Sequence, residues 1–559
     1  MENNKDNSNI NNGKSLFRSR RGLTLSGLAM ATLPLVIAAN VHAFELEFAE
    51  DSELSGSLDV TLGYAASWRA VDADRSDLVC CFGARGLNFT ADARDPDAGD
   101  LITNIVRATT ELELNWRNYG LVTSASYQYD REIMKDDAAV DIFTEQRIDS
   151  SRAAKDYAGN TLDVLDAYVY GSFDVGENPL EVRVGKQVIN WGEGLFFIGG
   201  VATQVPLNFN KLTTPGAELK EAYIGNDAVY AQMGIGDDSS LEAYYQWKWH
   251  RTELPPLDTF YGSEALGRGG DSHITSAGIT ARAPDETPDD DGQWGTAFRT
   301  TVGDTEIGFY YSRYHETLPV LALDQSDPGN FSGVCGNIPC NTVLGVSQIW
   351  AEDQDMYGLS ASTTIGTWSV SGEIAYRPDQ ALWGDMFGKG FVNTTAGKDF
   401  LTNIERHDTV HAAINGIWLG GPLSFVGIDS QVVLAQVGMD HISGNLDNLA
   451  VNSAITRVVD FATITPDSES YGAAVEWIGT WQGIRPGTDL SLDLFLQKDF
   501  KGNSHFWGNF AEGRTLFAAT LTANVGTDWE TSLGYSGNHF NRSDYEDQDI
   551  IGLSVNYKF

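Results

Sequence analysis

The chain has 559 residues, and its 77 Asp and Glu against 37 Lys and Arg give a formal net charge of −40 at pH 7. A charge of this sign and size repels nucleic acid at long range, so we expect no nucleic-acid partner. After the first 43 residues no apolar stretch is long enough to cross a bilayer as a helix, which excludes a helical membrane protein.

The amino terminus is typical of an export signal. Basic residues up to Arg21 precede an apolar run over residues 23–39, and Val41-His42-Ala43 fits a cleavage site. The run is short for a spanning helix, although a single anchor helix is the alternative. We therefore expect residues 1–43 to be a signal peptide and residues 44–559 to form one domain.

Four cysteines lie in two close pairs further along the chain. An exported protein meets an oxidising compartment, so we expect disulfides in the long loops that hold these residues. The pairing stays open, because four cysteines allow three connectivities and a vicinal bridge is strained. The candidates are Cys80, Cys81, Cys335 and Cys340. No histidine lies near either pair, and we expect neither a metal nor a cofactor.

Alternating segments of about ten residues recur along the chain. From Leu241 to Trp249 the odd positions are apolar or aromatic, while Glu242, Gln246 and Lys248 fall on the other face. Such alternation, repeated many times, is the signature of strands with one face in lipid and one in an aqueous lumen. The same pattern occurs at 58–68, 106–116, 368–377, 489–497, 517–525 and 529–535.

Short and long connections alternate between these segments. Residues 118–120 and 526–527 form short turns, which we place in the periplasm, and residues 71–99 and 316–346 form long outer loops. This rule predicts an all-β transmembrane antiparallel barrel of about 18 strands, within a range of about 16 to 20. The soluble alternative, a β-sandwich, would leave the apolar stripes exposed to water.

The last strand has a distinctive end. Leu553, Val555, Tyr557 and Phe559 share one face and finish on an aromatic residue. This ending resembles the terminal signal of outer-membrane barrels, which implies insertion by the barrel-assembly machinery. The expected location is the outer membrane, in contact with the bilayer and with lipopolysaccharide.

One stretch, from Gly185 to Ala222, breaks the alternation. It is too long for a periplasmic turn, and its aromatic residues argue against disorder. We expect a long loop that folds into the lumen and narrows it, since a barrel of this size otherwise encloses a channel. Packing as an ordinary plug is the alternative for any single residue. The candidate constriction and solute contacts are Lys186, Trp191, Glu193, Phe196, Phe197, Lys211, Glu218, Lys220 and Glu221.

The sequence resembles the proteobacterial outer-membrane family catalogued as domain of unknown function 1302. The resemblance is carried by Leu165–Gly171, Val184–Glu193, Pro215–Ala222 and Ser240–Gln246. It implies a porin-like barrel, often found with a periplasmic protein and an inner-membrane permease in bacteria that handle steroids, aromatics or other hydrophobic compounds. It supplies no catalytic residues.

The expected function is therefore passage of small hydrophobic or amphipathic organic molecules across the outer membrane. Export together with an inner-membrane permease and a structural or adhesive barrel are the alternatives. An enzyme would need a nucleophile beside a positioned histidine. His407 and His411 share a face of one predicted strand but have no serine-centred motif, so we expect no enzymatic activity.

Overall fold

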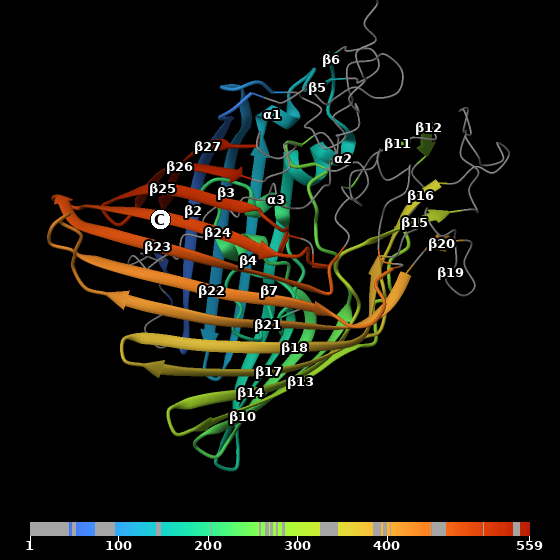
Figure 1. Ribbon diagram of the computed structural model, residues 1–559. Helices are drawn as coiled ribbons and strands as arrows, with labels where there is room; N and C mark the ends of the chain where they lie inside the picture. The colour runs from blue at the N-terminus through green and yellow to red at the C-terminus, as the bar shows by residue number, and fades with distance from the viewer. Residues whose placement is uncertain are drawn as a thin grey trace, which may run out of the picture.

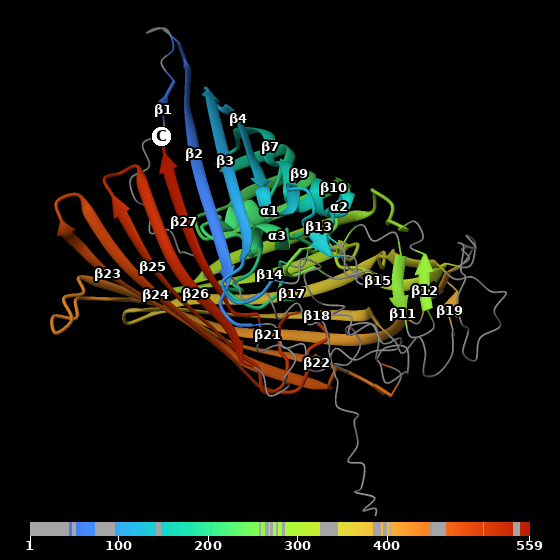
Figure 2. The ribbon, with the colours of Figure 1, turned by 90° about the horizontal axis from the view of Figure 1, so that it is seen from above.

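The computed structural model describes residues 44–46, 48, 52–72, 96–140, 147–202, 204–256, 259–262, 268, 272–275, 278–281, 285–324, 345–383, 393–394, 400–402, 404–447, 449, 466–506, 508–539 and 548–559. Its main feature is a closed antiparallel β-barrel (Figures 1 and 2). The barrel strands are β2 (Leu54–Arg69), β3 (Leu101–Trp116), β4 (Tyr119–Asp130), β7 (Asn160–Val175), β8 (Asn178–Gln187), β9 (Asn226–Ile235), β10 (Ser239–Lys248), β13 (Gln293–Val302), β14 (Thr305–Tyr314), β17 (Gln354–Ile365), β18 (Trp368–Trp383), β21 (Ile404–Gly420), β22 (Ser430–Ile442), β23 (Glu469–Arg485), β24 (Thr488–Lys501), β25 (Thr515–Val525), β26 (Trp529–His539) and β27 (Ile550–Lys558).

Closure of the barrel comes from pairing of its first and last strands. The main sheet has 19 strands, and without the two-residue β1 (Phe44–Glu45) the ring has 18. β27 pairs with β2 from Arg69↔Ile550 to Thr61↔Lys558, as Figure 2 shows from above. Because closure pairs every strand edge, the sheet can sit in lipid without unpaired backbone groups. The predicted fold class and strand number are confirmed.

The remaining elements are short. The helices are α1 (Arg131–Met134), α2 (Arg152–Ala154) with a following π-helix (Lys155–Gly159), α3 (Phe209–Leu212) and α4 (Leu219–Ala222). Small sheets form from β5 (Ala139–Val140) with β6 (Arg147–Ile148), from β11 (Ser272–Thr275) with β12 (Gly278–Ala281), and from β15 (Val320–Asp324), β16 (Gly345–Ile349), β19 (Asn393–Thr394) and β20 (Phe400–Thr402). Among the described residues no helix is long and apolar enough to cross a membrane.

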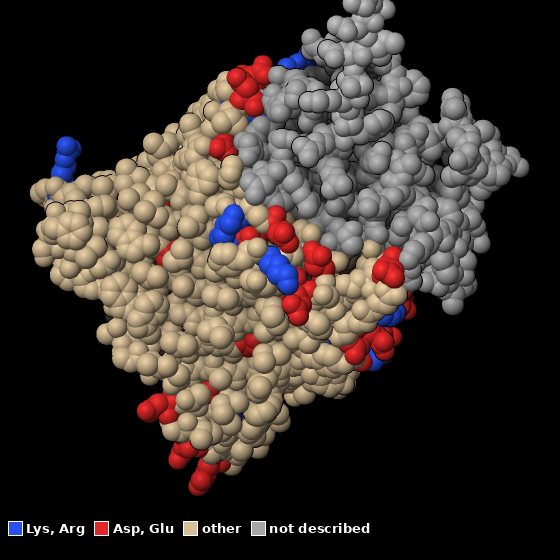
Figure 3. All heavy atoms as spheres, in the orientation of Figure 1, with Lys and Arg blue, Asp and Glu red and all other residues tan. Residues whose placement is uncertain are grey.

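The predicted alternation is visible in side-chain exposure. In β10, Leu241, Tyr245 and Trp247 are exposed on the outer surface, whereas Glu242 and Gln246 are buried in the lumen. Figure 3 shows the result, a broad face with most of its charged side chains along the margins. One detail of the prediction is wrong: Trp249 does not face lipid. The strand shifts register near Lys248, and Trp249 packs on Trp350, with ring centroids 5.2 Å apart.

Aromatic pairs mark the end of the barrel that has the short turns. Trp116 stacks with Tyr119 at the β3–β4 turn, and Trp368 stacks with Trp418 where β18 meets β21. Such rings are favoured at the membrane–water interface, because each has an apolar body and a polar edge. The closed ring, the apolar belt and these rings are the features of an outer-membrane barrel, and the outer membrane is its location.

Candidate functional site

The segment between β8 and β9 lies inside the barrel. Its residues contact inward-facing side chains of β3, β4, β10, β18, β22 and β24, which lie on different sides of the ring. Two details of the sequence prediction need correction. Lys186 belongs to β8, which continues to Gln187, and the segment is not wholly irregular because it contains α3 and α4. We call residues 188–205 the aromatic half and residues 206–225 the helical half.

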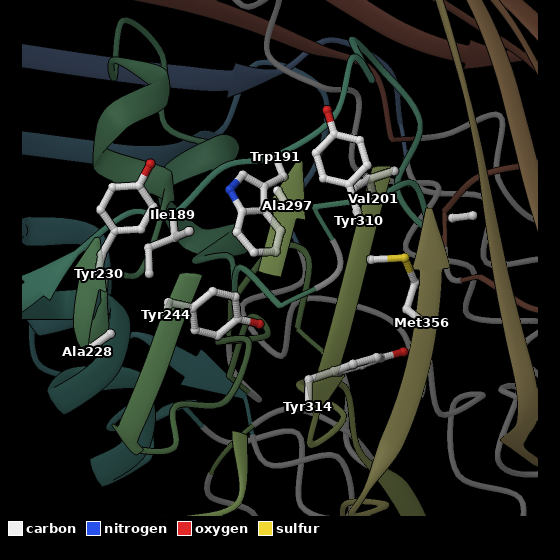
Figure 4. Close-up of a cluster of buried hydrophobic side chains, with 11 residues drawn as sticks. Ile189, Trp191, Val201, Ala228, Tyr230, Tyr244, Ala297, Tyr310, Tyr314 and Met356 are labelled. Carbon is white, nitrogen blue, oxygen red and sulfur yellow. The ribbon is translucent and has the colours of Figure 1, made fainter. Parts of the chain in front are cut away.

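The aromatic half begins with an anchor on one wall of the lumen. The side chain of Trp191 is only 2% exposed and packs on Tyr244 and Tyr310, with ring centroids 5.2 and 5.9 Å away (Figure 4). Its indole nitrogen donates a hydrogen bond of 2.7 Å to Glu242. Met356 belongs to the same buried cluster. Trp191 is therefore fixed by both packing and a polar contact.

A second anchor lies on another wall. Phe196 and Phe197 are 5% and 6% exposed, and their rings lie 5.5 Å from Phe495 and 4.7 Å from Phe510 respectively. They join an apolar cluster built on inward-facing residues of β22 to β25. Its wall members are Val432, Leu434, Ala474, Ile478, Phe495, Leu516 and Ala518. The aromatic half therefore reaches between two hydrophobic clusters inside the lumen.

Polar side chains of the wall satisfy the backbone of the aromatic half. The carboxylate of Glu373 accepts hydrogen bonds from the backbone N–H groups of Glu193 and Val201. Gln436 accepts from the N–H groups of Phe196 and Phe197. An irregular backbone held away from bulk water needs such partners, since each unpaired buried group is costly. The wall thus fixes the path of this half as well as its position.

Charged groups hold the helical half. Arg107 of β3 and Glu221 of α4 form a buried ion pair of 2.9 Å, and Ser126 donates a 2.7 Å hydrogen bond to Glu221. Burial opposes ionisation of Glu221, but Arg107 and Ser126 outweigh it and hold the pKa of this carboxyl below its usual value. On α3, Lys211 donates to Gln128 at 2.8 Å and lies 3.4 Å from Asp163.

The nine predicted constriction residues differ in what they face. Trp191, Phe196, Phe197, Lys211 and Glu221 are buried against the wall. Lys186, Glu193 and Glu218 are half-buried and Lys220 is exposed, paired at 3.1 Å with Glu111 and with Glu218. Direct contact of these residues with a solute stays a prediction, because the contacts seen are with the protein itself.

Glu193 is the half-buried carboxyl of the aromatic half. Burial raises its pKa, and the neighbouring Arg299 partly offsets this effect. Its backbone carbonyl accepts a hydrogen bond from Asn415. Glu193 therefore joins the loop to the wall through its backbone, and its carboxyl group lies near the charged Arg299.

Sequence reasoning missed a second segment that folds inward. Residues 502–506 and 508–514, between β24 and β25, bring Phe510 onto Phe197 and place Asn509 where its side chain bonds both the N–H and the carbonyl of Ile198. Asp499 and Arg514 form a buried ion pair at its base. The segment is short, and no pattern in it distinguishes an inward loop from a surface loop.

The predicted pair of histidines lies on one face of β21, as expected. Nδ1 of His411 lies 2.6 Å from Asp440, and Ser504 donates to the other oxygen of Asp440. A nucleophilic serine would instead donate to the histidine. The hydroxyl and the imidazole thus both bind the same carboxylate, which is not the arrangement of a hydrolase triad.

Several other predicted residues can be placed only in part. Ser554 and Asn556 of β27 are buried in the lumen, while Leu553, Val555, Tyr557 and Phe559 are on the outer face. Their role as an insertion signal stays a prediction. The signal peptide and all four cysteines lie outside the described residues. Within the described part of the chain, no group of three or more His, Cys, Asp or Glu is arranged to hold a metal ion.

Comparison with known proteins identifies a family. No curated protein matches the chain. Solved structures that resemble it include OccAB1 of Acinetobacter baumannii, at 9% identity and a TM-score of 0.42 over 93% of this chain and 98% of that one. Another is OpdK of Pseudomonas aeruginosa with vanillate, at 10% identity and a TM-score of 0.40 over 92% of this chain and 100% of that one. The family model described as "Protein of unknown function (DUF1302)" matches residues 24–559, and the chain belongs to this family.

Proposed function

We propose that this porin-like barrel is a channel that passes small hydrophobic or amphipathic organic molecules across the outer membrane. The observation that carries the proposal is the aromatic half of the inward segment, which lies between two apolar clusters within the lumen. An ordinary aqueous pore has a polar lumen wall. Here Val432, Leu434 and Phe495 face inward and the aromatic half packs on them, so the segment and the lumen wall meet through apolar contacts.

In this proposal the segment is a constriction whose parts have different tasks. The buried Trp191, Phe196 and Phe197 hold the segment in place against the lumen wall. The half-buried Glu193 and the exposed Lys220 provide charges that a solute meets. No step of this passage requires a catalytic group.

The test is removal of the constriction from the full-length protein in planar bilayers. Replacing residues 192–213 with a short Gly-Ser link should raise the conductance and reduce discrimination among solutes, because the wall remains while its filling is lost. The control replaces the periplasmic turn at residues 422–427 with the same link. This change should alter neither the conductance nor the discrimination among solutes. Unchanged conductance of a folded barrel lacking residues 192–213 would contradict the proposal.

A finer test uses solute uptake in vesicles. Alanine at Trp191, Phe196 or Phe197 should slow uptake of an apolar solute and leave small ions unaffected. If all three variants take up the solute as the parent does, these residues have no part in selectivity.

A partner periplasmic protein and an inner-membrane permease would act downstream of this channel, and co-purification from membranes is the measurement that tests them.

A further inference from the structure

Arginines that face the lumen fall into two kinds. Arg107, Arg377 and Arg514 are at most 4% exposed and are engaged by the loops or by buried carboxylates. The side chains of Arg183 on β8 and Arg299 on β13 are instead 34% and 26% exposed. The second kind therefore remains accessible from the lumen.

Tyrosine rings fix the planes of these two guanidinium groups. Arg183 lies over Tyr168 and Tyr230, with its guanidinium carbon 5.8 and 5.4 Å from the ring centroids. Arg299 lies over Tyr310 at 5.6 Å. Such stacking orients a guanidinium and leaves its edge free to donate hydrogen bonds.

The tyrosines that support the arginines are themselves immobilised. The hydroxyl of Tyr230 donates 2.9 Å to Glu242, the residue that also accepts from Trp191. The hydroxyl of Tyr310 lies 3.0 Å from that of Ser360. Figure 4 shows Tyr230 and Tyr310 on either side of Trp191. The two arginines thus stack on tyrosines in a rigid part of the wall, and the same part of the wall contacts the aromatic half.

Each guanidinium already has a carboxylate beside it. Nε of Arg183 donates 2.5 Å to Glu181. Nε of Arg299 lies 3.2 Å from Glu242, and its Nη1 lies 3.5 Å from Glu306. A bound anion would be repelled by these glutamates, and a bound cation would be repelled by the arginines. A neutral molecule avoids both penalties, because the remaining N–H groups can donate to an oxygen atom without a change in net charge.

We propose that Tyr168, Arg183, Tyr230, Glu242, Arg299 and Tyr310, which we call the arginine–tyrosine ladder, bind neutral, planar, oxygen-bearing organic molecules. The flat part of the ligand stacks on Tyr168 and on the guanidinium planes, and its hydroxyl or carbonyl oxygen accepts a hydrogen bond from an arginine. This deepens the proposed function, on which it rests, by naming a class of solute.

The experiment is calorimetric titration of the full-length barrel in lipid nanodiscs. The probes are 4-hydroxyacetophenone as the neutral ligand, 4-hydroxybenzoate as the anion and tyramine as the cation. Arg183→Lys and Arg299→Lys keep the charge but lose the planar fork, and each should weaken binding of the neutral probe about fivefold. Arg117→Lys is the matched control, because Arg117 stacks on Trp116 and pairs with Glu53 at a turn outside the lumen. Tyr168→Leu is a second variant that leaves both ion pairs in place.

Several outcomes overturn the inference. It fails if 4-hydroxybenzoate or tyramine binds more tightly than the neutral probe. It also fails if the Lys variants and Tyr168→Leu bind the neutral probe as the parent does. Binding of the probe without its permeation contradicts the proposed channel and leaves the ladder in place. Permeation with unchanged binding in all three variants contradicts the ladder alone.

Discussion

The two halves of the inward segment are held inside the same barrel by different forces. The aromatic half is fixed by two hydrophobic clusters and by wall side chains that bond its backbone. The helical half is fixed by ion pairs such as Arg107 with Glu221, both almost fully buried. Apolar packing does not depend on the protonation of a side chain, whereas a buried ion pair depends on both partners being charged. The helical half is therefore the part of the segment whose stability depends on a buried ion pair.

The residues that hold the segment in place and the residues that carry charge on its accessible side lie at different positions. Residues buried in the clusters cannot change without loss of packing, while Glu193 and Lys220 can change at little structural cost. Hydrogen exchange measured by mass spectrometry reports the two halves separately, because each opens with its own free energy.

The largest expected effect is loss of the aromatic anchor. Trp191→Ala should lower the free energy of opening of the aromatic half by about 4 kcal/mol, because it leaves a cavity between Tyr244 and Tyr310. Exchange in residues 188–205 should rise while that in residues 206–225 changes less. Phe425→Ala is the control, since Phe425 is 84% exposed on a turn. Equal protection of residues 188–205 in the variant and the parent would show that the cluster does not hold this half.

The converse change removes a charge from the helical half. Glu221→Gln should destabilise residues 206–225 by about 3 kcal/mol, because it leaves Arg107 buried without its charged partner. Exchange of residues 188–205 should stay close to that of the parent. If both halves loosen together, the segment opens as one unit and the comparison between the halves is wrong.

A smaller change tests how closely the segment approaches the wall. A Cβ atom on Gly200 would lie 1.7 Å from a carboxylate oxygen of Glu373, so that Gly200→Ala must displace the group that accepts from Val201. Overpacking of this kind costs about 2 kcal/mol, visible as faster exchange in the aromatic half. Gly194→Ala is matched to it, because the nearest atom to that Cβ is 3.4 Å away. Similar exchange in the two variants would contradict the close approach at Gly200.

Much of the barrel could be predicted from the sequence because its strands obey one rule. Lipid selects apolar residues at every second position, and segments such as 241–247 show this directly. The rule fails where the lumen is not aqueous. Leu434 and Phe495 face inward, and nothing in their own strands shows that Phe196 will cover them.

The candidate site was predictable only in outline. Length and aromatic content indicated an inward segment, but the wall residues that hold it come from strands far away in sequence. Glu373 bonds a backbone N–H group 172 positions away, at Val201. The predicted start of the segment is also too early, because Gly185 and the polar Lys186 do not follow the strand pattern although β8 continues to Gln187. Wall residues that are distant in sequence can be identified as partners of the segment only from the closed barrel.

The smallest expected effect is a response to pH that differs in sign between the halves. The pKa of Glu221 is lowered in the folded protein, so its contribution to stability is complete at neutral pH. This contribution starts to fall near the usual value of about 4.3 and is lost as the pH falls on through the lower pKa of the folded protein. At pH 4 residues 206–225 should therefore be less stable than at pH 7. The pKa of Glu193 is raised, so protonation there favours the folded aromatic half as the pH falls.

The measurement is hydrogen exchange at pH 7 and pH 4, corrected for the intrinsic rate. On going to pH 4, exchange should rise in residues 206–225 and fall or stay constant in residues 188–205. Glu221→Gln should abolish the first change and Glu193→Gln the second. If acid loosens both halves equally in the parent and in both variants, other groups govern the response, and charge does not distinguish the two halves.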